Sequence, residues 1–320
     1  MTTPTVSPYL APFALDEPRS YPFHRLGRAS ANHRWWRPLV VAVVAIGFYL
    51  GFLLSLFLPL VIVALVFPAV GAWLDESNDA LDAIDLSDPV TFGVVMLSII
   101  LMLPAIILAN LLLGARPAGL LTSVAGRLRW RWFARCSGLA AAVCSGGMLV
   151  SFGVGMLTGQ PVMVADVNPN LALMLVLVLL LVPFQAAAEE YIFRGYLMQT
   201  IGTWLRHPAF AILLPVPLFI VGHDYELLGM IDVGIFAIAA GWLTWRTGGL
   251  EAAVALHIVN NVLIFALGAW GLLDVNASDS TVGGLVVSLA ITIVFVFVVV
   301  RDADHLSIAR ERPHFANNSQ

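Results

Sequence analysis

Long apolar segments with almost no charge constrain the fold of this chain more than any other feature. Several of them reach about 18 or more residues, enough for a helix to cross the hydrocarbon core of a bilayer. Hydrophobic residues make up 60% of the chain and charged residues only 11%, at a mean hydropathy of +0.90. A β-barrel would instead show alternating segments of about ten residues. The sequence therefore predicts an all-α polytopic protein of the cell membrane.

We expect about eight transmembrane helices. The first is long and contains Pro59, which should kink or break it, and the fifth is short and interrupted by Pro215 and Pro217. The expected spans are 39–66, 91–113, 137–157, 171–205, 209–222, 227–245, 252–272 and 282–300.

These spans divide the chain into four parts. A flexible cytoplasmic tail (1–37) precedes the N-terminal membrane helices (38–170). A core (171–272) carries the polar motifs described below, and the last membrane helix and a cytoplasmic tail follow (273–320).

The distribution of cations predicts the orientation. All 16 are arginines, and the eight-span arrangement places each of them on the inner side, provided that Arg194 is counted there. The charged residues in the loop between the first two spans are all acidic: Asp75, Glu76, Asp79, Asp82, Asp85 and Asp88. Because arginine-rich loops stay in the cytoplasm, both termini are predicted to be cytoplasmic.

Several other kinds of site are not indicated. Cys136 and Cys144 fall in one apolar segment, so we expect small packing residues rather than a disulfide or a metal pair. No removable signal peptide, heptad pattern or nucleotide-binding glycine pattern is found. The expected partners are the lipid bilayer and a membrane-associated peptide or protein, and not nucleic acid.

Two carboxylates and an arginine follow the uncharged run 171–184. Charged residues at membrane depth are rare, usually paired, and by default mark function. Glu190 and Arg194 lie four apart and share a helix face, whereas Glu189 is rotated by about 100°. We expect Arg194 to neutralise Glu190 and to leave Glu189 for chemistry. A solvated helix end in the interfacial layer would explain the same residues without a function.

Further polar residues punctuate the following spans. His223 ends the short fifth span, and His257 and Asn261 lie on the same side of one helix. A single histidine in a membrane helix is more often a packing or hydrogen-bonding residue than a catalyst. Asp232 either faces a cavity or binds a neighbouring helix, and the structural role is favoured.

Three ordered motifs resemble those of the CPBP intramembrane proteases. They are Glu189-Glu190-x-x-x-Arg194, Phe219-x-x-x-His223 and His257-x-x-x-Asn261, with Thr247-Gly248-Gly249-Leu250 before the last. That family includes CAAX prenyl endopeptidases and bacterial relatives linked to bacteriocin processing or self-immunity. The resemblance covers about 171–272.

The resemblance implies a role for each residue. Peptide hydrolysis needs an activated water, a proton donor for the leaving amine and stabilisation of the oxyanion. Glu189 and His223 would activate the water, and His257 and Asn261 would support the oxyanion. Glu190 and Arg194, as a pair, would hold the helix in place.

The need for a metal stays open. Glu189, His223 and His257 could form a zinc site with one open position, but the compact HExxH signature is absent. Family members are described both as metalloproteases and as metal-free enzymes, and we prefer the metal-free mechanism.

Three functions are compatible with these residues. The leading hypothesis is an intramembrane endopeptidase that cleaves a membrane-associated protein or peptide. A non-catalytic immunity or scaffold protein could retain the motifs as a structural network. An ion-coupled transporter with a Glu–His relay is disfavoured because no repeated half with a matching broken helix is found.

Overall fold

The computed structural model describes residues 20–30, 33–76, 84–159, 161–278 and 281–313. Nearly all of its elements are helices. In chain order they are β1 (Ser20–Pro22), η1 (Phe23–Ala29), α1 (Arg37–Val66), α2 (Pro68–Glu76), α4 (Pro89–Ile100), α5 (Met102–Leu113), η2 (Ala118–Leu121), α6 (Trp130–Leu157), α7 (Leu171–Glu190), η3 (Tyr191–Leu197), α8 (Met198–Trp204), α9 (Pro208–Leu213), α10 (Val216–Val221), α11 (Leu227–Thr247), α12 (Glu251–Ala269), α13 (Val282–His305) and β2 (Glu311–Pro313).

Seven helical stretches in the described residues are long and apolar enough to cross a membrane. They confirm the all-α polytopic membrane fold, but their number is one lower than expected. The predicted fifth span is instead a shorter apolar stretch, Pro208–Val221, which is divided into α9 and α10 next to Pro215. Helix α1 runs through Pro59 without a break.

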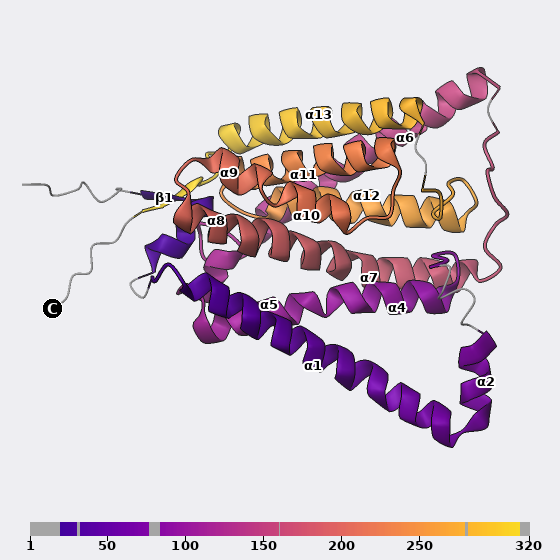
Figure 1. Cartoon of the computed structure of the whole chain (residues 1–320). Coiled ribbons are helices and arrows are strands. Elements are labelled where there is room, and N and C mark those ends of the chain that lie inside the picture. Colours follow the sequence, from indigo (N-terminus) through magenta and orange to yellow (C-terminus); the bar gives the residue numbers. More distant parts are fainter. Residues whose placement is uncertain (1–19, 31–32, 77–83, 160, 279–280, 314–320) are drawn as a thin grey trace, which may run out of the picture.

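The helices run lengthwise beside one another, and α1 diverges from the others towards its C-terminal end (Figure 1). Helix α12 packs against both α6 and α7. The first turns of α12 contain Ala252, Ala253 and Ala255, all fully buried. Small residues allow helix backbones to approach closely, so α12 forms the centre of the bundle.

A partly buried ion pair fixes the start of α12. Arg129 binds Glu251 through two contacts, Nε to Oε1 at 2.8 Å and Nη2 to Oε2 at 2.6 Å, and it also donates to the Thr247 carbonyl. Between α11 and α12, Gly248 adopts a left-handed conformation with φ +70°, which glycine tolerates without strain. The sequence interpretation missed Glu251, because it lies just before the expected span.

The two ends of the described chain meet. Strand β1 pairs with β2 in antiparallel register, with Tyr21 opposite Arg312, so both ends lie at the same end of the bundle (Figure 1). The expectation of a flexible tail is wrong for 20–30, because Phe23 and Leu26 are fully buried and η1 packs against α8. Residues 1–19 of that predicted tail lie outside the described residues.

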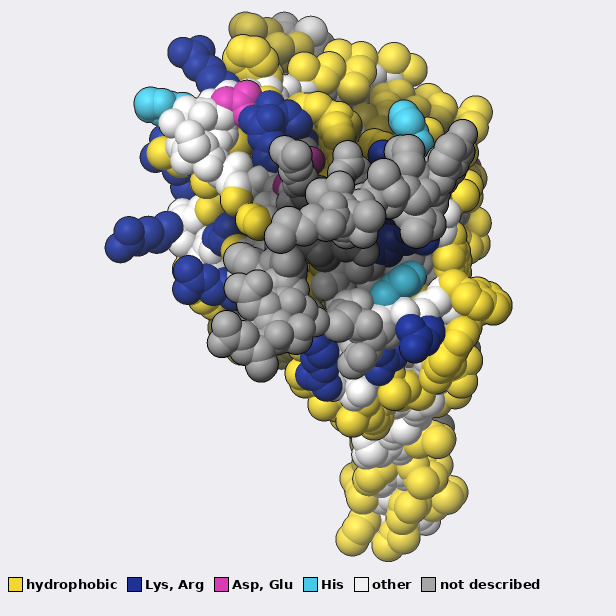
Figure 2. Space-filling view, turned by 90° about the vertical axis from the view of Figure 1, so that its left-hand side faces the viewer, with side chains coloured by type: hydrophobic (Ala, Val, Ile, Leu, Met, Phe, Trp, Pro, Cys, Tyr) yellow, Lys and Arg dark blue, Asp and Glu magenta, His cyan; other side chains and the backbone are white. Residues whose placement is uncertain are grey.

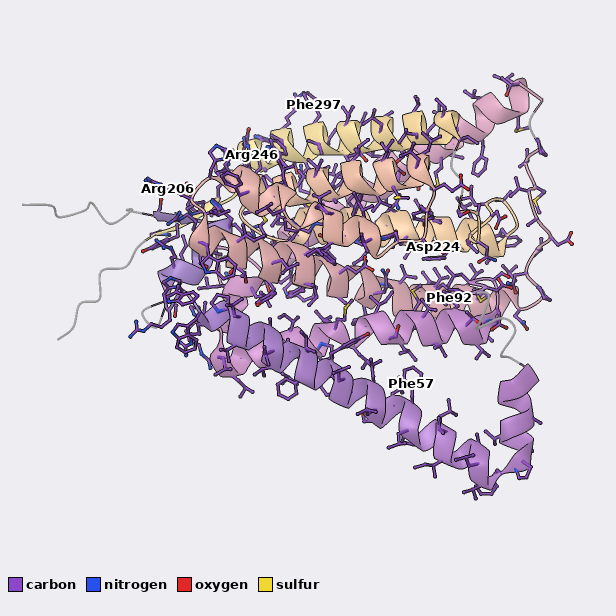
Figure 3. The ribbon with its side chains drawn as sticks, viewed as in Figure 1. Phe57, Phe92, Arg206, Asp224, Arg246 and Phe297 are labelled. Carbon is purple, nitrogen blue, oxygen red and sulfur yellow. The ribbon has the colours of Figure 1, made fainter. Side chains whose placement is uncertain are left out.

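Arginine side chains gather on the face formed by this end of the bundle (Figure 2). Figure 3 labels two of them, Arg206 and Arg246, near the left-hand end of the helices. The clustering agrees with the sorting of arginines expected from the sequence, and it stays a prediction that this end faces the cytoplasm. Cys136 and Cys144 are free and buried within the core of α6, α12 and α13, as expected for packing residues.

The orientation can be tested by cysteine labelling, because both native cysteines are buried. In intact cells, a membrane-impermeant maleimide should label Ser278→Cys, in the loop before α13, and should not label Arg127→Cys. Both positions are exposed, and permeabilised cells provide the positive control for each. Labelling of Arg127→Cys in intact cells would contradict the predicted orientation.

Candidate active site

Helix α7 carries the carboxylate pair into the bundle. Its 20 residues end at Glu190 and continue directly into a π-helix, η3, and then α8. Glu190 is 0% and Glu189 8% exposed, and Arg194 is also buried. π-Helical turns inside longer helices occur frequently at functional sites. The interpretation of these residues as a solvated helix end is therefore wrong.

The pairing of Glu190 with Arg194 is confirmed. Arg194 Nη1 donates to Glu190 Oε1 at 2.8 Å, and Arg194 Nη2 donates to the Ala237 carbonyl of α11 at 3.2 Å. The guanidinium also lies over the ring of Phe219, 4.4 Å from its centre. A cation over an aromatic face is attracted by the ring quadrupole. Arg194 therefore joins α7 and η3 to α10 and α11.

His257 of α12 lies between the two glutamates. Its Nδ1 is 2.8 Å from Glu190 Oε1, and its Nε2 is 3.6 Å from Glu189 Oε2. An ionised carboxylate can only accept hydrogen bonds, so Nδ1 carries the proton in that contact. In a neutral ring Nε2 is then an acceptor. A proton or a water molecule between Nε2 and Glu189 would satisfy both acceptors.

Glu189 differs from Glu190 in its surroundings. Its Oε1 accepts from Gln185 at 2.9 Å. Its Oε2 is buried and, like Glu190 Oε2, has no hydrogen-bond partner among the described residues. Burying a polar atom without a partner carries a free-energy cost. Of these two oxygens, Glu189 Oε2 is the one that lies 3.6 Å from His257 Nε2.

Gln185 is a site residue that the sequence interpretation missed. While its amide nitrogen binds Glu189, its amide oxygen accepts from Asn261 Nδ2 at 3.3 Å. Asn260 donates to the Asn261 Oδ1 at 3.2 Å, which fixes the orientation of that amide. Gln185 lies four residues before Glu189 and so shares its helix face. This spacing was the signal that could have identified it.

His223 is not joined to the other site residues. Its Nδ1 contacts the Phe219 carbonyl at 2.8 Å, and its ring lies 4.9 Å from that of Phe219. The Phe219 ring in turn lies 6.3 Å from the ring of His257. The pairing of His223 with Glu189, implied by the family resemblance, thus has no direct contact in this arrangement.

The loop 222–226 places His223 beside Tyr225, and the two rings stack with their centres 6.0 Å apart. Asp224 belongs to the same loop. In Figure 3 it lies to the left of the point where α12 ends. Burial raises the pKa of Tyr225, and the charges of Asp232 and Glu189 add to the increase.

The three residues expected as zinc ligands are Glu189, His223 and His257. Glu189 and His257 approach each other, but the described residues contain no group of three His, Cys, Asp or Glu side chains placed to hold a metal ion. His223 does not complete such a set here. The three side chains are thus not gathered into a metal site among the described residues, and both the zinc site and the metal-free mechanism stay predictions.

Asp232 has a partner outside the site. Its Oδ1 accepts a hydrogen bond of 2.6 Å from the Ser288 hydroxyl of α13. This bond joins α11 to α13, as the structural interpretation of Asp232 predicted.

The buried ion pair can be tested by substituting the cation. Arg194→Ala leaves Glu190 buried without its partner, which should cost on the order of 3–5 kcal/mol of folding free energy. We expect a lower thermal unfolding midpoint and less folded protein in detergent extracts. Arg310→Ala is the matched control, because Arg310 pairs with Asp304 at an exposed site and should cost roughly 1 kcal/mol or less. Equal stability of the two variants would contradict the buried pair.

Comparison with known proteins agrees with the motifs. Residues 168–263 match the model of a family described as type II CAAX prenyl endopeptidase Rce1-like. An uncharacterized protein of Bacillus subtilis, YyaK, is 36% identical over 93 residues, which cover 27% of this chain and 31% of YyaK. The chain thus matches less than a third of that relative's length. No solved structure matches the chain. Residues 168–263, which contain the three ordered motifs, are thus similar to the Rce1-like CAAX prenyl endopeptidase family.

Proposed function

We propose that this protein is an intramembrane endopeptidase that hydrolyses a peptide bond in a membrane-associated protein or peptide. One observation carries the proposal: Glu189 Oε2 is buried without a hydrogen-bond partner among the described residues, 3.6 Å from His257 Nε2. The family match over 168–263 supports a protease of this class.

The proposed reaction begins with a water held by Glu189 Oε2 and His257 Nε2. Glu189 takes one proton from this water as its oxygen bonds to the carbonyl carbon of the substrate. The carbonyl oxygen becomes an oxyanion. When the tetrahedral intermediate collapses, the C–N bond breaks and the leaving amine receives the proton from Glu189. General base catalysis of this kind contributes roughly 10²–10⁴-fold to the rate.

Glu190 has a separate task in this scheme. Its charge is shared between Arg194 and His257, so it holds the imidazole with Nε2 facing Glu189. Glu189 is the base in this scheme because its Oε2 lies 3.6 Å from that Nε2.

Asn261 would donate a hydrogen bond to the oxyanion. One hydrogen of its amide binds Gln185, and the other is available to a substrate oxygen. Removing one such donor typically lowers the rate roughly 10²–10³-fold.

The proposal is tested by comparing membrane proteomes. Cells carrying the wild-type protein should yield at least one new peptide terminus that is absent from cells carrying Glu189→Gln. The purified proteins should reproduce this cleavage on a synthetic peptide, with and without a chelator. Loss of activity with the chelator and recovery with zinc would show that a metal is required.

Asp232→Asn is the matched control. It replaces a membrane-embedded carboxylate by an amide, as Glu189→Gln does, but at a residue bound to Ser288 outside the site. We expect it to cleave like the wild type. If Glu189→Gln also cleaves like the wild type, the proposal fails and a non-catalytic scaffold or immunity role takes its place.

A second prediction concerns Gln185. Gln185→Leu removes the donor to Glu189 and the acceptor for Asn261, so both catalytic groups lose their orientation. We expect kcat to fall roughly 10–100-fold by analogy with other supporting residues, while KM changes little. Gln185→Glu preserves the acceptor but not the donor and should not restore the rate. A kcat within about twofold of the wild type in Gln185→Leu would show that Gln185 does not position the base.

A further inference from the structure

Some of the arginines at the arginine-rich end of the bundle have carboxylate partners. They lie at the start of α6 or on it, on α11 and in the segment after α13. The pairs are Arg129–Glu251, Arg135–Asp302, Arg246–Asp304 and Arg310–Asp304. In Figure 2 the carboxylates visible on this face lie in its upper part, beside arginines.

Other arginines at this end have no carboxylate partner among the described residues. Arg34 donates only to the neighbouring His33 carbonyl at 3.1 Å, and Arg28 donates to the Thr203 carbonyl at 2.9 Å. The complete set is Arg25, Arg28, Arg34, Arg116, Arg127, Arg131, Arg206 and Arg301. A cluster of cations without counter-charges produces a positive potential that attracts anions.

The positive charge of these arginines lowers the pKa values of two neighbouring groups, His33 and Arg25. Burial lowers the pKa of His33, and the charges of Arg28 and Arg34 lower it further. Burial also lowers the pKa of Arg25, together with the charges of Arg28 and Arg206. Each of these groups lies outside the membrane-spanning helices, so the positive charge is concentrated at the boundary of the membrane.

One part of this region is hollow. A cavity of about 60 Å³ lies between η1, the start of α1, the end of α5 and α8. A second space of about 310 Å³ adjoins it and shares Arg34, Arg37 and Leu113 with it. We call the two together the arginine cavity. His33 also lines the smaller part.

Several polar side chains of the arginine cavity are already engaged. Tyr196 donates to the Pro38 carbonyl, and Gln199 donates to the Leu120 carbonyl at 2.7 Å. The guanidinium of Arg34 therefore dominates what the cavity can recognise. Arginine binds phosphate through charge-assisted hydrogen bonds, which are about twice as strong as neutral ones.

The side chains around the arginine cavity are of the kinds that contact lipid. Trp35 is 67% exposed, and Trp204 donates to the Trp35 carbonyl at 2.8 Å. Tryptophan is enriched where a membrane meets water. On α1, next to the cavity, the exposed side chains are apolar: Leu39, Val40 and Val43. A ligand here would therefore meet cations at its head and an apolar helix face along its chain.

We propose that the arginine cavity binds the phosphate headgroup of an anionic phospholipid, with an acyl chain along the exposed face of α1. The site is separate from Glu189 and does not depend on the proposed function. It holds the start of α1 against α5 and α8 through a lipid.

The proposal is tested on the purified full-length protein in detergent. Phosphatidylglycerol is titrated against phosphatidylcholine with the same acyl chains, and binding is followed by native mass spectrometry. We expect phosphatidylglycerol to bind more tightly. Arg34→Gln should weaken it roughly fivefold, and Arg34→Gln with Arg37→Gln roughly twenty-five-fold, from the usual contribution of an arginine near an anionic membrane.

Arg310→Gln is the control for net charge and should leave phosphatidylglycerol affinity unchanged. If the double variant does not fold, Arg34→Gln alone decides, because Arg34 is exposed. Equal affinity for the two lipids, or an equal loss in Arg310→Gln, would overturn the proposal. Competition by millimolar inorganic phosphate with no lipid preference would assign the cavity to free phosphate instead.

Discussion

Glu190 places a buried negative charge at the centre of the bundle, and Arg194 and His257 compensate for it. Glu190 Oε1 lies 2.8 Å from both partners. A buried charge is tolerated only when it is paired and hydrogen-bonded. Because Arg194 also binds the Ala237 carbonyl and the Phe219 ring, this charge requires α7, α10, α11 and α12 to keep their positions. The rest of the candidate site depends on that arrangement.

The same interaction makes the two adjacent glutamates unequal. Glu190 is fixed by its partners, and through His257 it sets the direction of the imidazole. Glu189 receives a single hydrogen bond from Gln185. Each glutamate also has a buried Oε2 without a hydrogen-bond partner among the described residues, and that of Glu189 lies 3.6 Å from His257 Nε2. We infer that Glu189 Oε2 is the functional oxygen and that Glu190 has a structural role.

The features predicted correctly from the sequence are those that depend on spacing within one helix or on local hydropathy. The ion pair of Glu190 and Arg194 follows from a separation of four residues on a helix, and the main spans follow from hydropathy. Contacts between distant segments could not be predicted in this way. Glu251 pairs with Arg129, 122 positions away, and β1 meets β2 across nearly the whole chain. The sequence predicted a flexible tail for residues 20–30, because their composition does not show that they pack against α8.

The short fifth span shows the limit of a family resemblance. Prolines predicted its interruption correctly, and the structure divides it into α9 and α10. The motif implied that His223 pairs with Glu189, but Phe219 contacts both His223 and His257. A sequence motif fixes residue types and order, whereas the distance between two side chains depends on how the helices that carry them pack.

The most direct test of the unequal roles compares Glu189→Gln with Glu190→Gln in parallel, by thermal unfolding and by peptide cleavage with purified protein. Glu189→Gln should unfold near the wild-type temperature and show no cleavage, because the amide oxygen still accepts from Gln185 but cannot take a proton. Glu190→Gln should unfold at a clearly lower temperature, since Arg194 then remains charged without its counter-ion. A destabilised Glu189→Gln together with a stable, inactive Glu190→Gln would contradict the account.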